Sequence, residues 1–88
     1  MEMEGMTFRT LRKYISQIDR VSICIKETLE YSNYLFLKDV PECYDDLFVF
    51  GIGIIESEFF EGTGDREKKV FLSCIEIMLA KEPKRIDE

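Results

Sequence analysis

The sequence predicts an α+β fold with one N-terminal helix packed on a small antiparallel sheet of about four strands. Three observations lead to this prediction. Apolar residues recur at helical spacing near the start of the chain, two long apolar runs are rich in β-branched and aromatic residues, and a glycine-containing segment connects those runs. The 88 residues fit a single domain spanning 1–88, and we expect residues 1–6 and 81–88 to be flexible ends.

The N-terminal helix is expected over residues 8–18. Thr7 is a suitable N-cap, because its hydroxyl can accept a hydrogen bond from a free backbone N–H of the first turn. The apolar positions that follow at helical spacing are Phe8, Leu11, Ile15 and Ile18. The remaining side carries Arg9, Arg12 and Lys13, so the helix should be amphipathic with a basic outer face.

Two short strands are expected after this helix. Apolar and small residues alternate from residue 21, which predicts a strand over 21–27. Residues 30–33 are polar and predict a turn, and residues 34–37 then predict the hairpin partner. Pro41 has no backbone N–H to give to a sheet, so residues 39–46 should form a loop or a short 3₁₀ turn.

The apolar segment 47–60 predicts the core strand of the sheet. Its even positions from Phe48 to Ile54 are all bulky and apolar, which predicts one buried face. Gly51 and Gly53 leave bare backbone on the opposite face. Close packing or a bend is a simpler explanation for these glycines than a groove that contacts a ligand.

The segment 69–80 fits two structures. As a helix, it would gather its polar side chains into one narrow stripe. As a strand, it would match 47–60 in length and close a hairpin with it through Gly62 and Gly64. We favour the strand and keep a C-terminal helix as the alternative.

Several short segments carry a resemblance to known proteins. They are Leu-Arg-Lys-Tyr-Ile at 11–15, Val-Ser-Ile at 21–23, Asp-Val-Pro-Glu-Cys-Tyr-Asp at 39–45, and the apolar runs 47–55 and 70–79. In this order they resemble small, mostly uncharacterised proteins encoded by phages and mobile elements of Gram-positive bacteria. The resemblance implies an N-terminal helix before a small antiparallel sheet, which favours the strand over 69–80, and it implies no activity.

The net charge of −6 is concentrated in residues 39–62, which contain no Lys or Arg. The acidic residues form a turn cluster and a strand-end cluster. The turn cluster is Asp39, Glu42, Asp45 and Asp46, and the strand-end cluster is Glu56, Glu58 and Glu61. If the intervening apolar residues form a straight strand at about 3.3 Å per residue, the two clusters lie roughly 30 Å apart, at opposite ends of the domain.

The composition excludes several classes of function. The chain has no histidine, so mechanisms that need a histidine base or ligand are absent. No phosphate-binding glycine motif or paired Cys-x-x-Cys spacing occurs, and no cofactor is expected. The acidic net charge disfavours direct nucleic-acid binding. We read Cys24 and Cys74 as core residues and Cys43 as the more exposed thiol.

The sequence also predicts a protein that stays in the cytoplasm and does not enter a membrane. The unbroken apolar run 47–55 is far shorter than the roughly 20 residues that a transmembrane helix needs. The first residues are acidic and polar, unlike a secretory signal, and Met6 is an alternative candidate for the first residue.

The leading functional hypothesis is a non-enzymatic interaction or modulator protein from a mobile element, which docks an acidic surface on a larger protein with a basic surface. The partner-binding candidates are Asp39, Glu42, Tyr44, Asp45, Asp46, Glu56, Glu58, Phe60 and Glu61. One alternative is a structural homodimer that buries exposed apolar strand surface or a sheet edge. A second alternative is a minimal metal-dependent hydrolase that uses paired carboxylates, namely Asp45 with Asp46 and Glu56 with Glu58.

Overall fold

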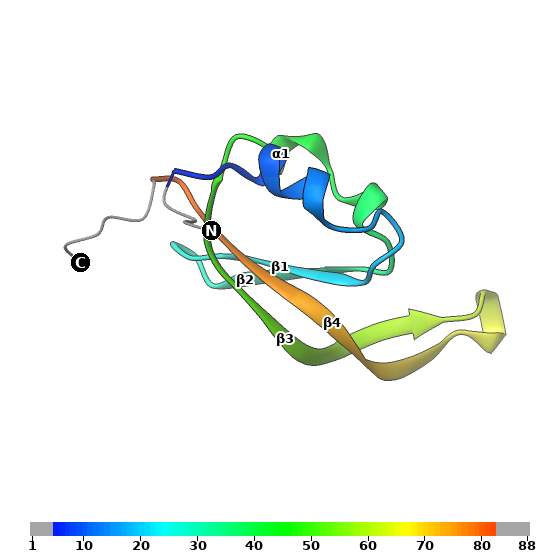
Figure 1. The fold of residues 1–88 in the computed structure, drawn as a ribbon. Helices are drawn as coiled ribbons and strands as arrows, with labels where there is room; N and C mark the ends of the chain where they lie inside the picture. The colour runs from blue at the N-terminus through cyan, green and yellow to red at the C-terminus, as the bar shows by residue number, and fades with distance from the viewer. Residues whose placement is uncertain (1–4, 83–88) are drawn as a thin grey trace.

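The computed structural model describes residues 5–82 as a four-stranded sheet with one short N-terminal helix (Figure 1). The strands are β1 (Val21–Ile25), β2 (Glu30–Tyr34), β3 (Phe48–Glu61) and β4 (Lys68–Ala80). The helix α1 (Phe8–Leu11) continues into a 3₁₀ turn, and two more 3₁₀ turns follow β2. The predicted combination of an N-terminal helix with a four-stranded sheet is therefore confirmed.

The sheet is mixed, so the prediction of a wholly antiparallel sheet is wrong. Its strand order is β2-β1-β4-β3. Two antiparallel hairpins, β1·β2 and β3·β4, are joined by parallel pairing of β1 with β4, in which Val21 lies opposite Ile75. The sequence signals that predict a hairpin lie within a few residues of its turn. Which strand of one hairpin pairs with which strand of the other depends instead on the path of the segment that connects them. The most apolar strands β1 and β4 take the central places, where both faces of the sheet are covered.

The strand prediction for 69–80 is confirmed, and the helix alternative is wrong. β4 pairs antiparallel with β3 from Lys68 to Ala80. Gly62, in the connection between the strands, adopts a φ of 90°, and a Cβ atom there would lie 2.5 Å from the backbone oxygen of Arg66. Only glycine fits this turn without strain. The glycine signal in the sequence therefore identified the hairpin correctly.

The second strand lies three to four residues closer to the N-terminus than predicted, at Glu30–Tyr34 instead of 34–37. Residues 30–33, expected as a turn, pair with β1, whereas Leu37 leaves the sheet and lies fully buried at the start of a 3₁₀ turn. The hairpin turns earlier, at residues 26–29, where Leu29 has a φ of 57°. The polar residues 30–33 resemble a turn because β2 is an edge strand with little burial.

The N-terminal helix is much shorter than the predicted 8–18. Thr7 caps it as predicted, accepting a hydrogen bond from the backbone N–H of Thr10. The chain becomes extended at Ile15, and the carbonyls of Gln17 and Asp19 accept hydrogen bonds from the backbone of residues 37–38. These contacts between distant segments compete with helix continuation, so Ile18 lies exposed instead of in the core.

The main core lies between the helix with the 3₁₀ turns and the face of the sheet that they cover (Figure 1). Its fully or nearly fully buried members are Phe8, Leu11, Val21, Ile23, Leu37, Val40, Val49, Ile77 and Leu79. We call this side of the sheet the helix-side face. On the opposite side, Cys24 and Cys74 are buried, whereas Cys43 is exposed, as predicted.

The even positions of β3 do not form one buried face, which corrects the sequence prediction. The pairing register shifts between Val49 and Gly51, so a β-bulge inserts one extra residue. A shift of one residue moves the following side chains to the other face. Phe48 therefore pairs with Ala80 on one face, whereas Ile52 pairs with Ile77 on the helix-side face. Beyond the reach of the helix, Ile54 is 74% exposed.

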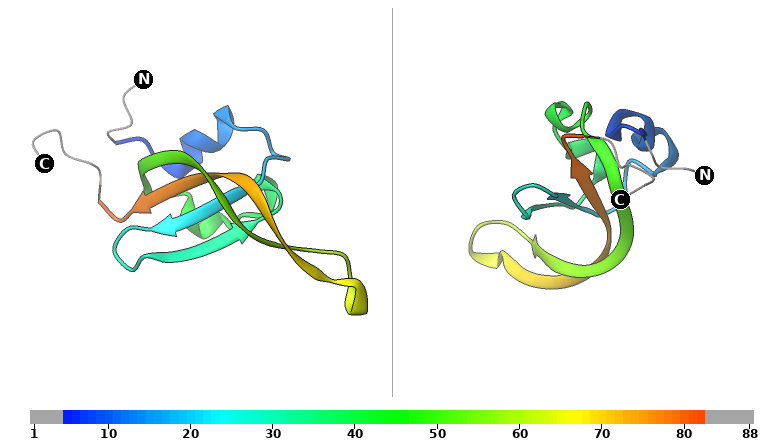
Figure 2. Two further views of the ribbon diagram at one scale, coloured as in Figure 1. Left: turned by 90° about the horizontal axis from the view of Figure 1, so that it is seen from below. Right: turned by 90° about the vertical axis from the view of Figure 1, so that its left-hand side faces the viewer.

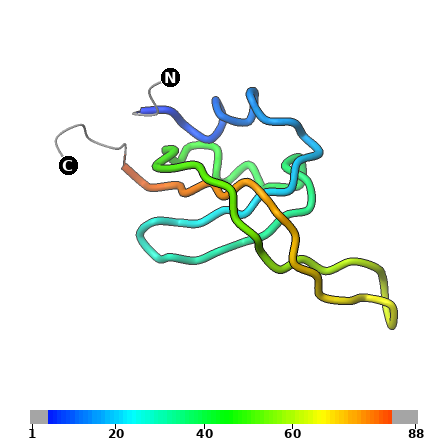
Figure 3. The backbone as a smooth tube through the Cα atoms, turned by 60° about the horizontal axis from the view of Figure 1, so that its bottom comes forward, coloured from blue at the N-terminus to red at the C-terminus, as the bar shows by residue number. Residues whose placement is uncertain are grey.

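The β3·β4 hairpin extends beyond β1 and curls under the sheet (Figure 2). This curl brings the far part of β3 toward β2, so that the two edge strands approach each other. The first and last described residues lie at the same end of the molecule (Figure 3). There, the carbonyl of Met6 accepts a hydrogen bond from Val49, and the Lys81 N–H donates to the Glu27 carboxylate.

The predicted flexible ends fall mostly outside the described residues, since residues 1–4 and 83–88 are not part of them. Within residues 5–82, no helix has the length and apolar character that crossing a membrane requires.

Candidate functional site

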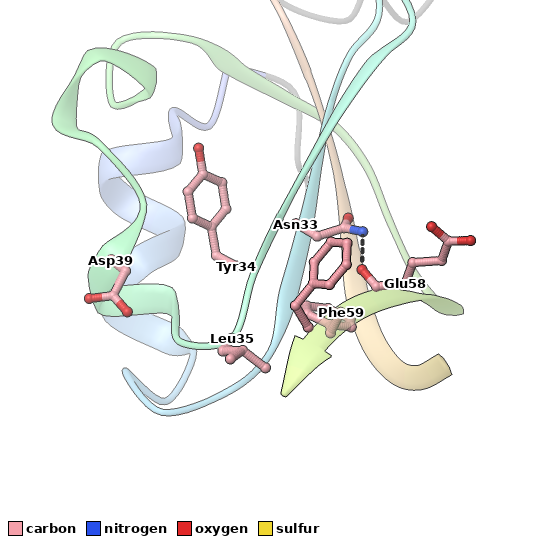
Figure 4. Close-up of a pocket in the computed structure, with 7 residues that line it drawn as sticks. Asn33, Tyr34, Leu35, Asp39, Glu58 and Phe59 are labelled. Atoms are coloured by element: carbon pink, nitrogen blue, oxygen red, sulfur yellow. Dashed lines mark hydrogen bonds between the residues drawn. The ribbon is translucent and has the colours of Figure 1, made fainter. Parts of the chain in front are cut away.

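A pocket of about 530 Å³ lies where the end of β2 meets the far part of β3 (Figure 4). Its lining combines two carboxylates with three aromatic rings, an amide and an aliphatic side chain. The lining residues are Asn33, Tyr34, Leu35, Asp39, Glu58, Phe59 and Phe60. Three of the nine predicted partner-binding residues, Asp39, Glu58 and Phe60, therefore share one pocket.

Asn33 fixes the two edge strands that form this pocket. Its Nδ2 donates to the Ser57 Oγ at 2.7 Å and to the backbone carbonyl of Glu58 at 2.8 Å. The second bond is the dashed line in Figure 4. After β2, the chain enters the 3₁₀ turn Leu37–Asp39, and burial of Leu37 anchors this turn beside the core. Asp39 thereby lines one end of the pocket and Glu58 the other, with Tyr34, Asn33 and Phe59 between them (Figure 4).

Asp39 and Glu58, one from each acidic cluster, line the same pocket, so these two members do not lie at opposite ends of the domain as the estimate of roughly 30 Å implied. That estimate assumed a straight strand between them. β3 bulges near Val49 and then curls under the sheet (Figure 2). This bend brings Glu58 to the same pocket as Asp39. One member of each cluster therefore lines the same pocket.

The pocket is acidic and open to solvent. The Asp39 carboxylate has no hydrogen-bond or ion-pair partner among residues 5–82, and its neighbour Lys38 lies over the Phe36 ring at 5.2 Å. Glu58 lies 3.5 Å from the Lys69 ammonium, with about half of each side chain exposed. Exposed pairs of this kind are weak and exchange readily with other partners. Both carboxylates are therefore accessible to a cation from outside.

The aromatic residues give the pocket an apolar wall. Phe59 is almost fully buried, whereas Phe60 is 56% exposed. Tyr34 packs partly against the core, and burial raises the pKa of its hydroxyl, with a hydrogen bond to Tyr44 adding to the effect. Carboxylates beside aromatic faces suit an amphipathic cation, because the charged head pairs with the acids and the stem packs on the rings.

Other members of the turn cluster contact the N-terminal helix of the same chain. Asp45 Oδ1 accepts a hydrogen bond from Arg12 Nε at 2.6 Å, and both side chains are largely buried. Asp46 pairs at 2.8 Å with Arg9 in an exposed position. The predicted basic helix face is therefore partly neutralised by the acidic segment. Asp45 is held in the structure and is unavailable to a partner.

The remaining predicted residues lie outside the pocket. Tyr44 is half-buried and packs against the core. Glu42, Glu56 and Glu61 are exposed, and none of them lines this pocket. Asn33, Tyr34 and Leu35 are not among the predicted site residues, because the sequence pattern predicts a turn ending at Asn33 and a strand beginning at Tyr34. An amide within a polar edge strand was the one local signal for Asn33.

The carboxylate pairs proposed for a metal-dependent hydrolase do not converge. Asp45 and Asp46 contact Arg12 and Arg9, respectively, and Glu58 lies beside Lys69. Across residues 5–82, no three acidic or cysteine side chains come together as metal ligands.

Comparisons of the chain with protein-family models, with curated proteins and with solved structures find no match. The resemblance to proteins of phages and mobile elements therefore stays a prediction.

Proposed function

We propose that this protein is a non-enzymatic interaction module of the cytoplasm that docks an acidic surface on a basic partner protein. The observation that carries the proposal is the pocket that joins Asp39 and Glu58 to the aromatic wall of β3. The resemblance of the sequence to mobile-element proteins motivates a partner in the host of such an element.

The chemistry of the pocket defines what it would bind on that partner. Two carboxylates on opposite sides of a cavity attract a lysine or arginine side chain, and they discriminate against an acidic one. Phe60 offers an exposed ring for cation–π contact with the charged group. The acidic field of residues 39–62 also raises the rate of encounter with a basic surface, in a manner that added salt weakens.

The first experiment uses a hexa-arginine peptide as the probe. We expect its addition to the ¹⁵N-labelled protein to shift the side-chain amide of Asn33 and the backbone amides of residues 58–60. A hexaglutamate peptide serves as the probe of opposite charge and should leave these signals in place. Shifts spread evenly over all acidic positions would contradict the proposal, because they would indicate charge attraction without a pocket.

The second experiment neutralises the pocket without changing its shape. We expect the double variant Asp39→Asn, Glu58→Gln to weaken peptide binding by about fivefold or more, since each lost charge contact contributes roughly 0.5 to 1 kcal/mol. Glu30→Gln, on the exposed other end of β2, is the matched control and should change binding by much less. Equal effects of the two variants would refute a specific role of the pocket.

A further inference from the structure

A second pocket, of about 240 Å³, lies where the segment after the N-terminal helix enters β1. Its aliphatic lining consists of three isoleucines from separate segments: Ile18 before β1, Ile54 on β3 and Ile75 on β4. Ile54 and Ile75 lie directly opposite each other in the β3·β4 ladder. Ile18 and Ile54 are 69% and 74% exposed, so the pocket opens to solvent between two uncovered aliphatic side chains.

Two residues of opposite charge border the same pocket. Asp19 and Arg20 line it together with Ser73 and Cys74. Arg20 Nε donates to the Ser73 carbonyl at 2.9 Å, whereas neither of its Nη groups has a partner among residues 5–82. In the same part of the chain, the Asp19 carboxylate has no hydrogen-bond or ion-pair partner and does not pair with Arg20. The pocket therefore combines an unpaired carboxylate and an unpaired guanidinium edge with an aliphatic lining.

Backbone hydrogen bonds hold both charged residues in place. The Asp19 carbonyl accepts from the Leu37 N–H at 2.9 Å, and the Arg20 carbonyl accepts from the Ile75 N–H at 3.1 Å. The Arg20 charge also acts on the thiol of Cys74: burial raises the pKa of this thiol, and the guanidinium partly offsets the rise. The charged residues are thus anchored before a ligand arrives, which lowers the entropic cost of binding.

We propose that this pocket binds a free α-amino acid with a branched aliphatic side chain. The carboxylate of the ligand accepts hydrogen bonds from the Nη groups of Arg20, and its ammonium pairs with the carboxylate of Asp19. The aliphatic side chain packs on the three isoleucines and covers surface that is otherwise exposed to water.

The two unpaired charges select this class of ligand over simpler ones. A fatty acid or a peptide C-terminus offers a carboxylate alone and would cover Asp19 without pairing it. An aliphatic amine or a peptide N-terminus would leave Arg20 in the same position. The pocket is also smaller than the roughly 300 to 1,000 Å³ that is typical for drug-sized ligands, which suits a molecule as small as an amino acid.

Nuclear magnetic resonance of isoleucine methyl groups tests the site, with L-leucine as the probe. In protein labelled with ¹³C at the isoleucine δ1 methyl groups, we expect leucine to shift the signals of Ile18, Ile54 and Ile75. The signal of Ile25, at the other end of β1, should stay in place. A ligand this small in an open pocket should bind with a dissociation constant on the order of 1 mM, so the titration extends to about 20 mM.

Two variants and two leucine analogues separate the roles of the charges. Asp19→Asn should weaken leucine binding by about fivefold or more, and it should not weaken binding of 4-methylpentanoate, which is leucine without its ammonium. Arg20→Gln should weaken binding of both, but not that of 3-methylbutylamine, which is leucine without its carboxylate. Glutamine can still donate to the Ser73 carbonyl. The matched controls are Asp65→Asn and Arg66→Gln, an exposed acidic and basic neighbour pair in the β3·β4 connection.

Unchanged isoleucine signals at about 20 mM leucine would overturn the proposal. Equal binding of leucine and its two analogues would also overturn it, because this result would show apolar contact without recognition of either charge. The same holds if the variants at positions 19 and 20 bind leucine as tightly as the wild type does. This pocket shares no lining residue with the pocket at Asp39, so its failure leaves the proposed function unaffected.

Discussion

The pairing of Arg12 with Asp45 should dominate the electrostatic contribution to stability. The guanidinium donates to Asp45 and also to the backbone carbonyls of Val40 and Pro41, and it lies 4.5 Å from the centre of the Phe8 ring. It therefore ties the N-terminal helix to the loop between β2 and β3. Both side chains are about 15% exposed, so water replaces little of what a substitution removes.

Asp45→Asn keeps the size of the side chain and removes its charge. The guanidinium then stays largely buried without its counter-ion, which should cost about 2 to 3 kcal/mol of unfolding free energy. In a domain of this size, a loss of about 2 kcal/mol lowers Tm by roughly 8 to 16 °C. The measurement is urea unfolding followed by far-ultraviolet circular dichroism. The dependence of the unfolding free energy on urea concentration should be the same for both proteins, so that the difference in midpoint reports stability alone.

Asp46→Asn supplies the matched control, because the same chemical change occurs one residue away at an 84% exposed side chain. We expect it to cost less than about 0.5 kcal/mol, and added salt should reduce even that difference. Equal losses from the two variants would refute the reasoning, since they would show that burial of the Arg12 pair adds nothing.

Two further predictions concern β2. Asn33→Ala should cost about 1 kcal/mol and speed hydrogen exchange in the far part of β3, because the variant removes the two bonds that join the edge strands; unchanged exchange there would contradict this. At Tyr31, a hydrogen bond with Cys24, then the charges of Cys24 and Glu76, raise the pKa to about 12 from 10.0. Because the folded state holds this proton more tightly, the stabilisation is complete below pH 10 and is lost as pH rises toward 12. Tyr31→Phe should therefore flatten the loss of stability in that range, which urea unfolding at each pH can measure, and an unchanged slope would contradict the assignment.

Local signals predicted the elements better than their assembly. The cap at Thr7 and the glycine connection at 61–66 specify backbone geometry within a few residues, and both predictions hold. The length of the helix does not follow from local signals, because backbone bonds to residues 37–38 end it at Ile15. The parallel pairing of β1 with β4 likewise depends on the path of the chain between two hairpins.

The candidate site could be predicted only in part, for a related reason. Asp39, Glu58 and Phe60 stood out because they lie in the acidic segment or beside its charges. Their meeting in one pocket depends on the bulge near Val49 and the curl of β3; Gly51 and Gly53 suggested a bend in this strand, but not its direction or the segment that it approaches. Alternation also predicted the wrong exposure for Ile54, because this residue lies on the helix-side face but beyond the part of the sheet that the helix covers.

The parallel pair at the centre of the sheet also determines when this chain can fold. Val21 and Ile75 are neighbours in space but are separated by 54 positions in the chain. On the ribosome, β1 and β2 can form a hairpin early, but a two-stranded hairpin alone is barely stable in water. The sheet closes only after β4 has been synthesised and has taken its place between β1 and β3. We therefore expect folding to be slow for so short a chain, with the apolar strand β3 exposed to solvent and to chaperones until β4 pairs with it.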